Sequence, residues 1–455
     1  MAYLCVNCGY STPGWLGRCP QCGEWNSFLE EKPTTPGKKN SAPGQDPLSL
    51  QEIEEKNLAE GKRLTTGFME VDRVLGGGIV EGSLVLLSGD PGIGKSTLLL
   101  KVAYYLSQKG EKVLYVSSEE SLYQLYIRIK RLIIPQIPSL FLLSTSSFEE
   151  LENGVKKVNP SLVVVDSIQN MLPSRGEFLP GGVAAVRDLS LKFMEMAKRK
   201  NIALFIVGHV TKEGTVAGPR TLEHLVDVVL YLEGEPQNPL RILRGTKNRF
   251  GSTQEVGLME MREEGLFDLI DPSHYFVAED QLNGSGTART VLAQGKRSVV
   301  VEVQSLVNPS YLGFPRRVSL GIDLNRLHLL LAVVEKTSRV KFFKSDVYLS
   351  IVGGIKAEET ASDLAACFSL VSSRVDRPLD KGTIFLGEVG LGGELRPVPL
   401  LDSRIQEASR IGIKRVVTSS YFLQDKKRKH HFPAEIQLIG YPTIQSALKQ
   451  ELDLG

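Results

Sequence analysis

A glycine-rich segment, GDPGIGKST at positions 89–97, combines the residue types that bind phosphate groups. Its glycines allow backbone N–H groups to curl around an anion at a helix N-terminus. Lys95 suits the β- and γ-phosphates, the Ser96 hydroxyl suits Mg²⁺, and Thr97 suits the α-phosphate. The apolar run SLVLLS precedes the segment and LLLKVAYYL follows it, as expected for a strand and a helix. The residues predicted to bind a nucleoside triphosphate are Gly89, Asp90, Pro91, Gly92, Ile93, Gly94, Lys95, Ser96 and Thr97.

Acidic residues end two further apolar runs. Asp166 closes SLVVVDS, where its carboxylate would hold the water shell of the magnesium ion together with Ser96. Glu119 and Glu120 follow KVLYVSS, and strand C-termini line the ligand crevice of such sheets. We expect Glu119 to polarise the attacking water. The alternative is a carboxylate that only stabilises the first turn of a helix.

Four cysteines near the N-terminus have the spacing of a metal site. Cys5 and Cys8 form one C-x2-C pair, and Cys19 and Cys22 form the second. Two such pairs complete a tetrahedron of thiolates around a structural Zn²⁺. The alternative is four free cysteines. The pattern leaves open whether this zinc ribbon contacts DNA or protein, and whether its tryptophans stack on bases or fill a small core.

Composition and hydrophobic patterning predict a protein of several domains. We expect a zinc ribbon at 1–31, a Pro/Gly/Lys-rich linker at 32–60, and an α/β domain with a mostly parallel sheet at 61–275. A second linker at 276–288 leads to an α+β domain at 289–455. The net charge of +2 excludes a uniformly basic surface, so any DNA contact must come from local patches. Neither a signal sequence nor a membrane span is expected, which predicts a cytoplasmic protein.

The segment LTTGFMEVDRVLGGGIVEGSLVLLSGDPGIGKST resembles the opening of the RecA-type ATPases. A zinc ribbon before it and KNRFG after it resemble bacterial DNA-repair members of that family. The resemblance implies a RecA-like fold that hydrolyses ATP with Mg²⁺ and depends on DNA. It further implies a homo-hexameric ring that acts on single-stranded or branched DNA in recombinational repair, by branch migration or unwinding, beside a RecA-type recombinase.

The resemblance also suggests roles for single residues. Glu119 falls at the position of the family's catalytic glutamate, and His209 becomes a candidate γ-phosphate sensor or a plain polar group at a strand end. In KNRFG, Lys247 and Arg249 would reach the nucleotide of the neighbouring subunit. The alternatives are direct contacts with DNA phosphates, or a charged hairpin of structural value only.

The resemblance also implies that two loops, 169–188 and 210–224, hold DNA without reading bases. The alternative is that both are disordered connections. Their isolated cations are Arg175, Arg187, Lys212 and Arg220. The basic run DKKRKHH at 425–431 is either a DNA-contact patch or a solvated loop.

The C-terminal domain resembles the proteolytic domain of Lon, on the segments DVYLSIVGGIKAEETASDLAACFSLVSS and GTIFLGEVGLGGELRPV. Lon-type peptidases need a serine activated by a lysine. Ala361 stands where that serine belongs, and Asp402 or Arg404 stands near the lysine position. We therefore expect no peptidase activity, and a domain that forms the ring and binds DNA.

Overall fold

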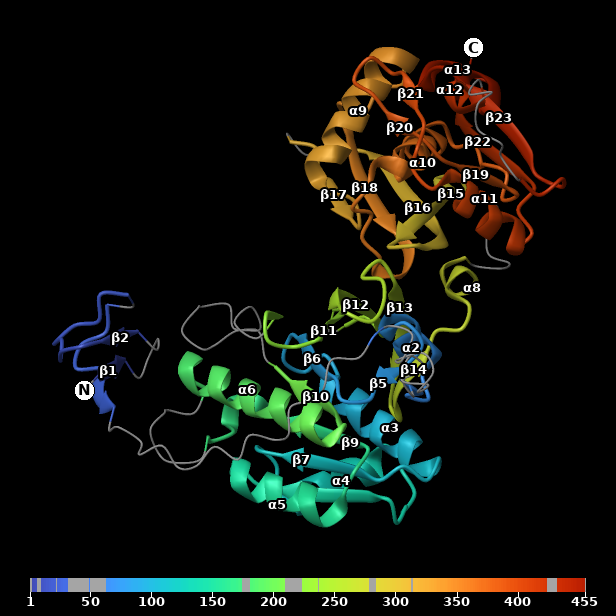
Figure 1. Ribbon diagram of the computed structural model, residues 1–455. Coiled ribbons are helices and arrows are strands. Elements are labelled where there is room, and N and C mark those ends of the chain that lie inside the picture. The colour runs from blue at the N-terminus through green and yellow to red at the C-terminus, as the bar shows by residue number, and fades with distance from the viewer. Residues whose placement is uncertain are drawn as a thin grey trace. The chain divides into compact units, whose positions relative to one another are not determined.

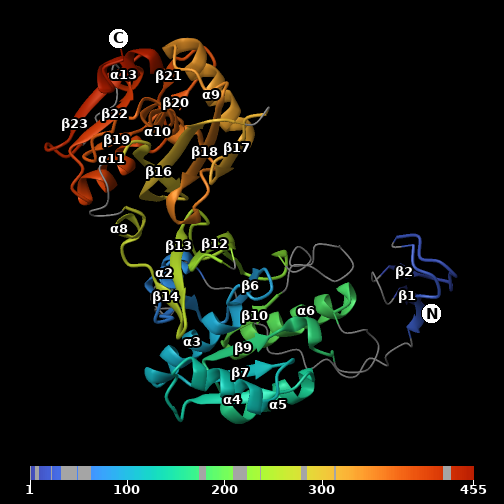
Figure 2. The same cartoon turned by 180° about the vertical axis from the view of Figure 1, so that it is seen from behind.

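The computed structural model folds as two compact units, Met1–Asp268 and Leu269–Gly455 (Figures 1 and 2). The residues it describes are 2–5, 10–21, 23–31, 49, 63–173, 181–208, 223–235, 237–277, 284–311, 314–423 and 432–454. Within these ranges no helix is long and apolar enough to cross a membrane.

The first unit begins with short strands and continues as alternating strands and helices. In chain order its elements are β1 (Ala2–Cys5), β2 (Ser11–Thr12), β3 (Phe28–Glu31), β4 (Arg63–Leu64), α2 (Met69–Leu75), β5 (Ile79–Val80), β6 (Leu84–Gly89), α3 (Lys95–Gln108), β7 (Val113–Ser117), α4 (Leu122–Arg131), β8 (Leu140–Ser144), α5 (Phe148–Val158), β9 (Leu162–Asp166), the 3-10 turn η1 (Ile168–Asn170), α6 (Val183–Lys200), β10 (Ala203–Val207), β11 (Val228–Glu233), β12 (Leu240–Asn248), β13 (Val256–Arg262) and β14 (Gly265–Asp268).

The large sheet of this unit is mostly parallel, which confirms the predicted α/β core. Its strand order is β14-β13-β12-β11-β6-β10-β9-β7-β8, with parallel pairing from β11 to β8 and antiparallel pairing from β11 to β14. The apolar runs SLVLLS, KVLYVSS and SLVVVDS form β6, β7 and β9. β8 was not predicted, because its run FLLS is short and lies at the sheet edge, where its side chains are only half-buried.

Apolar side chains cover both faces of this sheet. Alternate residues of β6 point to opposite sides, so Val85 and Leu87 join one core cluster while Leu84 and Leu86 join the other. Helices α2, α3 and α4 contribute to the first cluster, and α5 and α6 contribute to the second (Figure 1). Burial on both faces explains why these strands are continuous apolar runs rather than alternating ones.

The second unit is a mixed sheet with helices. Its elements are α8 (Pro272–Phe276), β15 (Thr287–Gln294), β16 (Arg297–Pro309), β17 (Arg317–Leu320), α9 (Leu324–Ser338), β18 (Ser345–Ile351), the 3-10 turns η2 (Val352–Gly354) and η3 (Thr360–Ser362), α10 (Asp363–Val375), β19 (Thr383–Phe385), β20 (Glu388–Val389), β21 (Leu395–Arg396), α11 (Leu401–Arg410), β22 (Arg415–Ser419), α12 (Ser420–Leu423), β23 (Gln437–Tyr441) and α13 (Ile444–Glu451).

Helix α10 is the centre of this unit. Ten consecutive residues, Asp363–Ser372, are buried, and the helix packs on β15, β16 and β19. The strand order of the large sheet is β17-β18-β16-β15-β19-β22-β23. Cys367 lies in this helix without solvent exposure, and its burial raises the pKa of the thiol far above the ordinary value.

A buried ion pair fixes the start of α10. The guanidinium of Arg326 on α9 donates to both carboxylate oxygens of Asp363, with 3.0 Å between Nε and Oδ1. The backbone N–H of Val389 donates to the same carboxylate at 3.2 Å. The Asp363 side chain is 2% exposed and the Arg326 side chain 25%. Removing one partner would therefore leave a charge with little water to solvate it.

We expect Asp363→Ala to lower the free energy of unfolding of the second unit by about 3 kcal/mol. This is the lower end of the range for breaking a buried pair, because Arg326 keeps some contact with water. The check is urea unfolding of the full chain, followed by hydrogen exchange at the α10 amides. The exposed Glu358→Ala serves as control and should change the value by less than about 0.5 kcal/mol. Equal effects of the two substitutions would contradict the assignment.

Candidate functional site

The predicted phosphate-binding segment 89–97 lies between the carboxyl end of β6 and the first turn of α3. Gly89 has φ 145°, and a Cβ there would lie 2.3 Å from the Leu232 carbonyl oxygen. Gly92 has φ 77°, but a Cβ there would meet no atom within 4 Å. The glycine at 89 is thus required by the neighbouring strand, whereas the glycine at 92 faces open space. The open side of the loop fits an approaching phosphate group.

Lys95 is folded back onto this loop. Its Nζ donates to the carbonyl oxygens of Gly89 at 2.7 Å and Asp90 at 2.9 Å. The residue is 4% exposed, and burial lowers its pKa, although Asp166, Asp90 and Glu119 oppose that shift. The ammonium group therefore lies among the loop carbonyls and the acidic residues that were predicted to share its site.

The two acidic residues meet because β7 and β9 are neighbours. Ser117 pairs with Asp166 in a parallel register, so both strands end at the same level. The hydroxyl of Ser167 donates to the Glu119 carboxylate at 2.7 Å, which ties Glu119 to the residue after Asp166. The sheet thus collects Lys95, Glu119 and Asp166 at one edge, beside the phosphate-binding segment.

Two residues that the sequence did not identify hold this arrangement. Tyr115 is fully buried and donates its hydroxyl to Asp166 Oδ2 at 2.6 Å. Burial, together with the Asp166 charge, raises the pKa of this phenol well above its ordinary value. Arg241 on β12 donates from Nε to the Ile93 carbonyl oxygen at 3.0 Å. In the sequence, Tyr115 is a tyrosine within an apolar strand, and Arg241 is an arginine near the start of another strand. Neither pattern identifies a functional residue unless the fold is known.

Glu120 differs from Glu119. It forms an ion pair with Arg128 on α4 at 2.6 Å, and burial raises the pKa of its carboxyl group. Its backbone N–H and that of Glu119 both donate to the Ser117 hydroxyl. Of the two neighbouring carboxylates, Glu120 therefore points to a helix cation and Glu119 to the Asp166–Ser167 segment.

A cavity of about 530 Å³ adjoins the first turn of α3. Its lining includes Thr97 on α3, Leu132 directly after α4, Met261 on β13 and Gly265 on β14. Its position beside Thr97 places it next to the phosphate-binding segment, where a nucleoside could extend.

The segment predicted to carry trans-acting cations, 245–251, is partly strand. β12 continues through Asn248, and a bulge leaves Lys247 opposite Val229 and Gly245 opposite Leu230. The extra residue of such a bulge cannot be recognised from the sequence without the partner strand. Arg249 follows the strand and pairs with Asp227 at 3.0 Å, with its side chain 51% exposed.

Several contacts fasten this segment. Lys247 Nζ donates to the Glu223 carbonyl oxygen at 2.7 Å, and burial together with nearby Arg249 lowers the pKa of its ammonium group. The Asn248 amide donates to the Val74 carbonyl oxygen at 3.1 Å, at the end of α2. Phe250 packs on the first core cluster.

The register places these cations far from the phosphate loop of their own chain. Val229, the partner of Lys247, pairs in turn with Leu86. Leu86 precedes Gly89 by three residues, or roughly 10 Å along the strand. Arg249 lies still closer to the amino end of β6. Its backbone N–H donates to the Asp227 carbonyl, and the Asp227 N–H donates to the Leu84 carbonyl. Lys247 and Arg249 therefore lie toward the amino end of β6, at the end opposite the predicted phosphate-binding segment.

In the zinc-ribbon segment, Cys5 and Cys19 occupy equivalent positions. The N–H of Cys5 donates to the Tyr10 carbonyl at 2.9 Å, and that of Cys19 donates to the Glu24 carbonyl at 2.8 Å. Both cysteines are buried and share a small cluster with Phe28. Two similar loops with buried thiols fit a tetrahedral zinc site. Cys8 and Cys22 lie outside the described residues.

The ribbon's two tryptophans do not fill its core. Trp15 is 54% exposed and Trp25 is 67% exposed. Both rings lie next to Gly17, and the Arg18 guanidinium lies 5.7 Å from the Trp25 ring centroid.

Most of the remaining predicted residues lie outside the described part of the chain. His209, Arg175, Lys212, Arg220 and the basic run 425–431 are outside the described ranges. Arg187 is described and is exposed on α6.

The segment compared with Lon has a buried arginine in place of a free amine. Ala361 lies in the 3-10 turn before α10, so Ser362 is rotated by roughly 120° from it. The guanidinium of Arg404 is fully buried, donates to the Pro399 carbonyl at 2.9 Å and pairs with Glu359. Asp402 is exposed on α11.

Comparisons with known proteins give the relationships of the chain. A family model described as the AAA domain matches residues 51–215, and one described as a rubredoxin metal binding domain matches residues 3–30. Among solved structures, a KaiC-like protein from Pyrococcus horikoshii is 20% identical with a TM-score of 0.37, covering 46% of this chain and 99% of its own. The RadB recombinase is 26% identical with a TM-score of 0.36, covering 45% and 99%.

Curated relatives match along nearly the whole chain. The DNA repair protein RadA of Bacillus subtilis is 44% identical over 99% of this chain and 98% of its own. The protein of the same name from Listeria monocytogenes is 42% identical over 99% and 98%. With this identity over its whole length, and with a P-loop ATPase core behind a zinc-ribbon segment, the chain belongs to the RadA family of DNA repair proteins.

Proposed function

We propose that this protein is a DNA-dependent ATPase of recombinational repair that works as a homo-hexameric ring. In this proposal it drives branch migration or unwinding on single-stranded or branched DNA, together with a RecA-type recombinase, in the cytoplasm. The relatives' name supports the repair role, and the AAA-domain match supports ATP hydrolysis.

The observation that carries the ring motor is the division of charged groups between two edges of one sheet. Lys95, Glu119 and Asp166 gather at the carboxyl edge, whereas Lys247 and Arg249 lie toward the amino edge. The second pair cannot reach the nucleotide of its own chain across that distance. Cations so placed can act on a nucleotide only in a neighbouring subunit, as a head-to-tail ring requires.

At the carboxyl edge each residue has a separate task. The nine residues of the 89–97 segment bind the phosphates of ATP, with Lys95 exchanging its loop carbonyls for phosphate oxygens. Ser96 and Asp166 hold magnesium, which neutralises charge on the phosphates when bound. Glu119 orients and polarises the attacking water, fixed by the Ser167 hydroxyl. Tyr115 fixes the direction of the Asp166 carboxylate.

At the amino edge, the neighbour's phosphates would compete for cations that are already engaged. Arg249 is half-exposed and held by one ion pair, so it can turn toward a new anion at modest cost. Lys247 holds backbone carbonyls and can exchange them in the same way. Asn248 and Phe250 keep the segment rigid while this occurs.

The second unit serves this proposal as a Lon-like scaffold for the ring and for DNA, without peptidase activity. Ala361 offers no nucleophile, and the buried Arg404 is neutralised by Glu359 rather than available as a base. The zinc ribbon holds its metal through Cys5, Cys8, Cys19 and Cys22.

Substitution of the two neighbouring glutamates separates catalysis from structure. Glu119→Gln should lower kcat for ATP hydrolysis by roughly 10²- to 10⁴-fold, because an amide cannot accept the proton of the attacking water. Glu120→Gln should change kcat by less than about threefold, since its partner is Arg128. Nucleotide affinity, measured by fluorescence titration, should be retained in both. A similar loss in both variants would overturn the assignment of Glu119.

Mixed rings test the neighbour-directed cations. Lys247→Ala and Lys95→Ala should each hydrolyse little ATP alone, with or without single-stranded DNA. When they are mixed and reassembled in equal amounts, roughly one interface in four pairs an intact loop with an intact cation, so activity should return. Lys449→Ala, an exposed lysine on α13, replaces Lys247→Ala in the control mixture. Activity equal to the sum of the separate proteins would reject action in trans.

Metal analysis tests the ribbon. The full chain should contain one zinc per polypeptide, and Cys19→Ser should lose it, because three thiolates bind zinc more weakly than four. Cys367→Ser, which alters a buried cysteine of α10, should retain the metal. Elemental analysis of the purified proteins gives the result, and a full zinc content in Cys19→Ser would contradict the ligand set.

A further inference from the structure

Helix α4 has an apolar face that nothing in its own unit covers. Of its ten residues only Leu125 is buried. The large apolar side chains that it exposes are Leu122, Tyr123, Tyr126 and Ile127, with Ile133 two residues past its end. Tyr123 is 71% exposed and Ile133 is 70% exposed. A helix draws most of its stability from packing, so a partner that covers this face would stabilise it.

The exposed residues share one side of the helix, and a cation lies beside them. Tyr126 lies four residues after Leu122, and residues at that spacing are neighbours on a helix surface. The Lys130 ammonium lies 5.5 Å from the Tyr126 ring centroid. Lys130 is exposed and forms no ion pair among the described residues, whereas Arg128 pairs with Glu120. The face therefore offers apolar area together with a positive charge.

The other end of the helix is less open to a charged partner. Arg131 lines the cavity of about 530 Å³ that Glu263 and Glu264 also line. Its charge is therefore opposed by carboxylates of the same unit. Lys130 is the cation of α4 that we assign to a partner.

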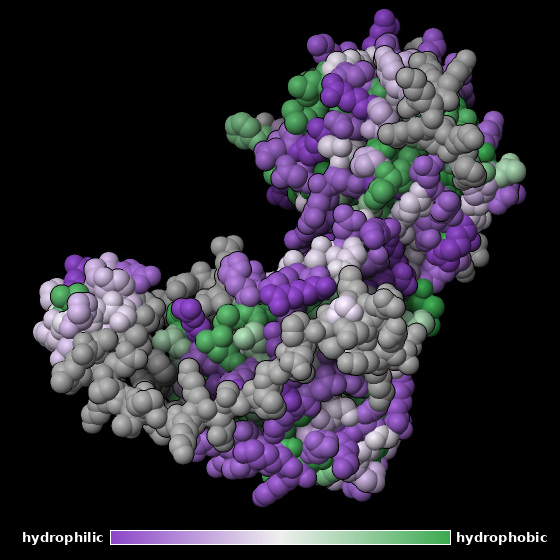
Figure 3. Space-filling model, viewed as in Figure 1, coloured by the Kyte–Doolittle hydropathy of each residue, from purple (hydrophilic) through white to green (hydrophobic). Residues whose placement is uncertain are grey.

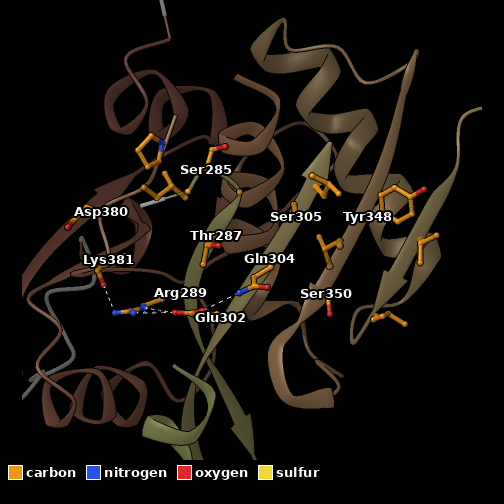
Figure 4. Close-up of a pocket in the computed structure, with 18 residues that line it drawn as sticks. Ser285, Thr287, Arg289, Glu302, Gln304, Ser305, Tyr348, Ser350, Asp380 and Lys381 are labelled. Atoms are coloured by element: carbon orange, nitrogen blue, oxygen red, sulfur yellow. Dashed lines mark hydrogen bonds and ion pairs between the residues drawn. The ribbon is translucent and has the colours of Figure 1, made fainter. Parts of the chain in front are cut away.

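Other apolar surfaces of the chain lack this combination. On the face shown in Figure 3 the described surface is largely hydrophilic, and its hydrophobic patches are separate. The second unit has a groove of about 1040 Å³ (Figure 4). In that groove Arg289 pairs with Glu302 at 3.2 Å, and Gln304 donates to the same carboxylate at 3.4 Å. These polar groups satisfy one another, whereas the α4 face matches a partner with apolar and acidic side chains.

The chain itself contains a segment of that composition. Residues 50–60, LQEIEEKNLAE, precede β4 and lie outside the described residues. The segment has large apolar residues at Leu50, Ile53 and Leu58. Its four glutamates and one lysine give it three net negative charges. The AAA-domain match begins at residue 51, so it includes almost all of the segment. Segment 50–60 thus complements α4 in both apolar content and charge.

This segment joins the fold at the amino end of the parallel strands. Arg63, the first residue of β4, donates from Nη2 to the Phe250 carbonyl oxygen at 3.0 Å. Phe250 directly follows Arg249, which lies toward the amino end of β6. Lys109, directly after α3, donates to the Thr65 hydroxyl. Both contacts fix the end of the segment far from the predicted phosphate-binding loop.

Helix α4 lies at the opposite end of the sheet. It follows the carboxyl end of β7, and Leu132 lines the same cavity as Thr97 in the first turn of α3. Helix α3 connects the two ends and has 14 residues, or a length of roughly 21 Å. Segment 50–60 would have to run back along that length to cover α4 of its own chain. In a head-to-tail ring the amino end of one sheet faces the carboxyl end of the next, so the shorter route leads to the neighbour.

We propose that the exposed face of α4 binds segment 50–60 of the neighbouring copy of this chain. The apolar residues of the segment cover the tyrosine and isoleucine side chains of α4, and its glutamates pair with Lys130. The inference rests on the proposed function, because it requires a ring. It adds a contact between copies that is separate from the cations Lys247 and Arg249.

Other occupants match the face less well. Bases of a nucleic acid could stack on Tyr123 and Tyr126, but Leu122 and Ile127 have no flat faces, and Lys130 alone gives little contact with phosphates. Two α4 helices from different copies would bring their cations together, which costs energy. Segment 50–60 satisfies the apolar area and the charge at once.

Photo-crosslinking of the full chain identifies the occupant. A chain with benzoylphenylalanine in place of Tyr126 is mixed with unsubstituted chain labelled with ¹⁵N, and rings are assembled with Mg²⁺ and ATP. Irradiation should join position 126 to ¹⁵N-labelled peptides that contain segment 50–60, as read by mass spectrometry. Benzoylphenylalanine in place of Leu191, which is exposed on α6, serves as control and should not join that segment.

Charge reversal tests the contact by assembly. In sedimentation velocity runs over a range of protein concentrations, Ile127→Asp should raise the concentration at which half of the rings dissociate by at least about tenfold, because it removes apolar burial and repels the glutamates. Lys130→Glu should also weaken assembly. Adding Glu54→Lys and Glu55→Lys to Lys130→Glu should restore it, which a merely structural role of Lys130 would not allow. Lys198→Glu, at an exposed position on α6, should change the value by less than about twofold. Thermal unfolding checks that each variant is folded.

The remaining outcomes reject the inference. A crosslink confined to one chain means that the segment covers α4 of its own copy. A crosslink to other residues, or assembly that the α4 variants leave unchanged, means that segment 50–60 does not bind this face. In each of these cases, DNA-stimulated ATP hydrolysis by wild-type rings leaves the proposed function intact. If the wild type neither assembles nor responds to DNA, the proposed function fails and this inference fails with it.

Discussion

The parallel register of β7 and β9 is the constraint on which the site depends. Because Ser117 lies opposite Asp166, the residues that follow the two strands meet at one edge. The hydrogen bond from Ser167 to Glu119 exists only in this register, as does the bond from Tyr115 to Asp166. A shift of one residue would turn every side chain of a strand to the other face and would separate the acidic groups from Lys95.

Strand β12 runs from the end of the sheet that carries the predicted phosphate-binding segment to the opposite end, which carries the cations. Near its start, Arg241 donates a hydrogen bond to the Ile93 carbonyl of the phosphate-binding loop. Near its end, hydrogen bonds from Lys247 and Asn248 hold the cationic segment in place. A single strand thus contacts the nucleotide loop of its own chain and carries the groups proposed for the next. In a ring, this would make the geometry of one site depend mechanically on its neighbour.

The second unit is built differently on the two faces of its sheet. Its covered face is dense, with α10 buried and its start fixed by Arg326 and Asp363. On α11, the fully buried Arg404 pairs with Glu359. On the opposite face of the sheet, Leu306 and Leu320 are more than half exposed.

The sequence by itself determined the local chemistry: the glycine loop with Lys95, the buried strand ending in Asp166, and the cysteine spacing. These are patterns of neighbouring residues, and local backbone preferences are sufficient to interpret them. Only the tertiary structure showed that Glu119 contacts Ser167 while Glu120 contacts Arg128. It also brought Tyr115 and Arg241 to the site and placed Lys247 toward the amino ends of the parallel strands. Those facts depend on contacts between residues far apart in the chain, such as the 148 positions between Ile93 and Arg241. Strand register decides such contacts, and no short segment of sequence encodes it.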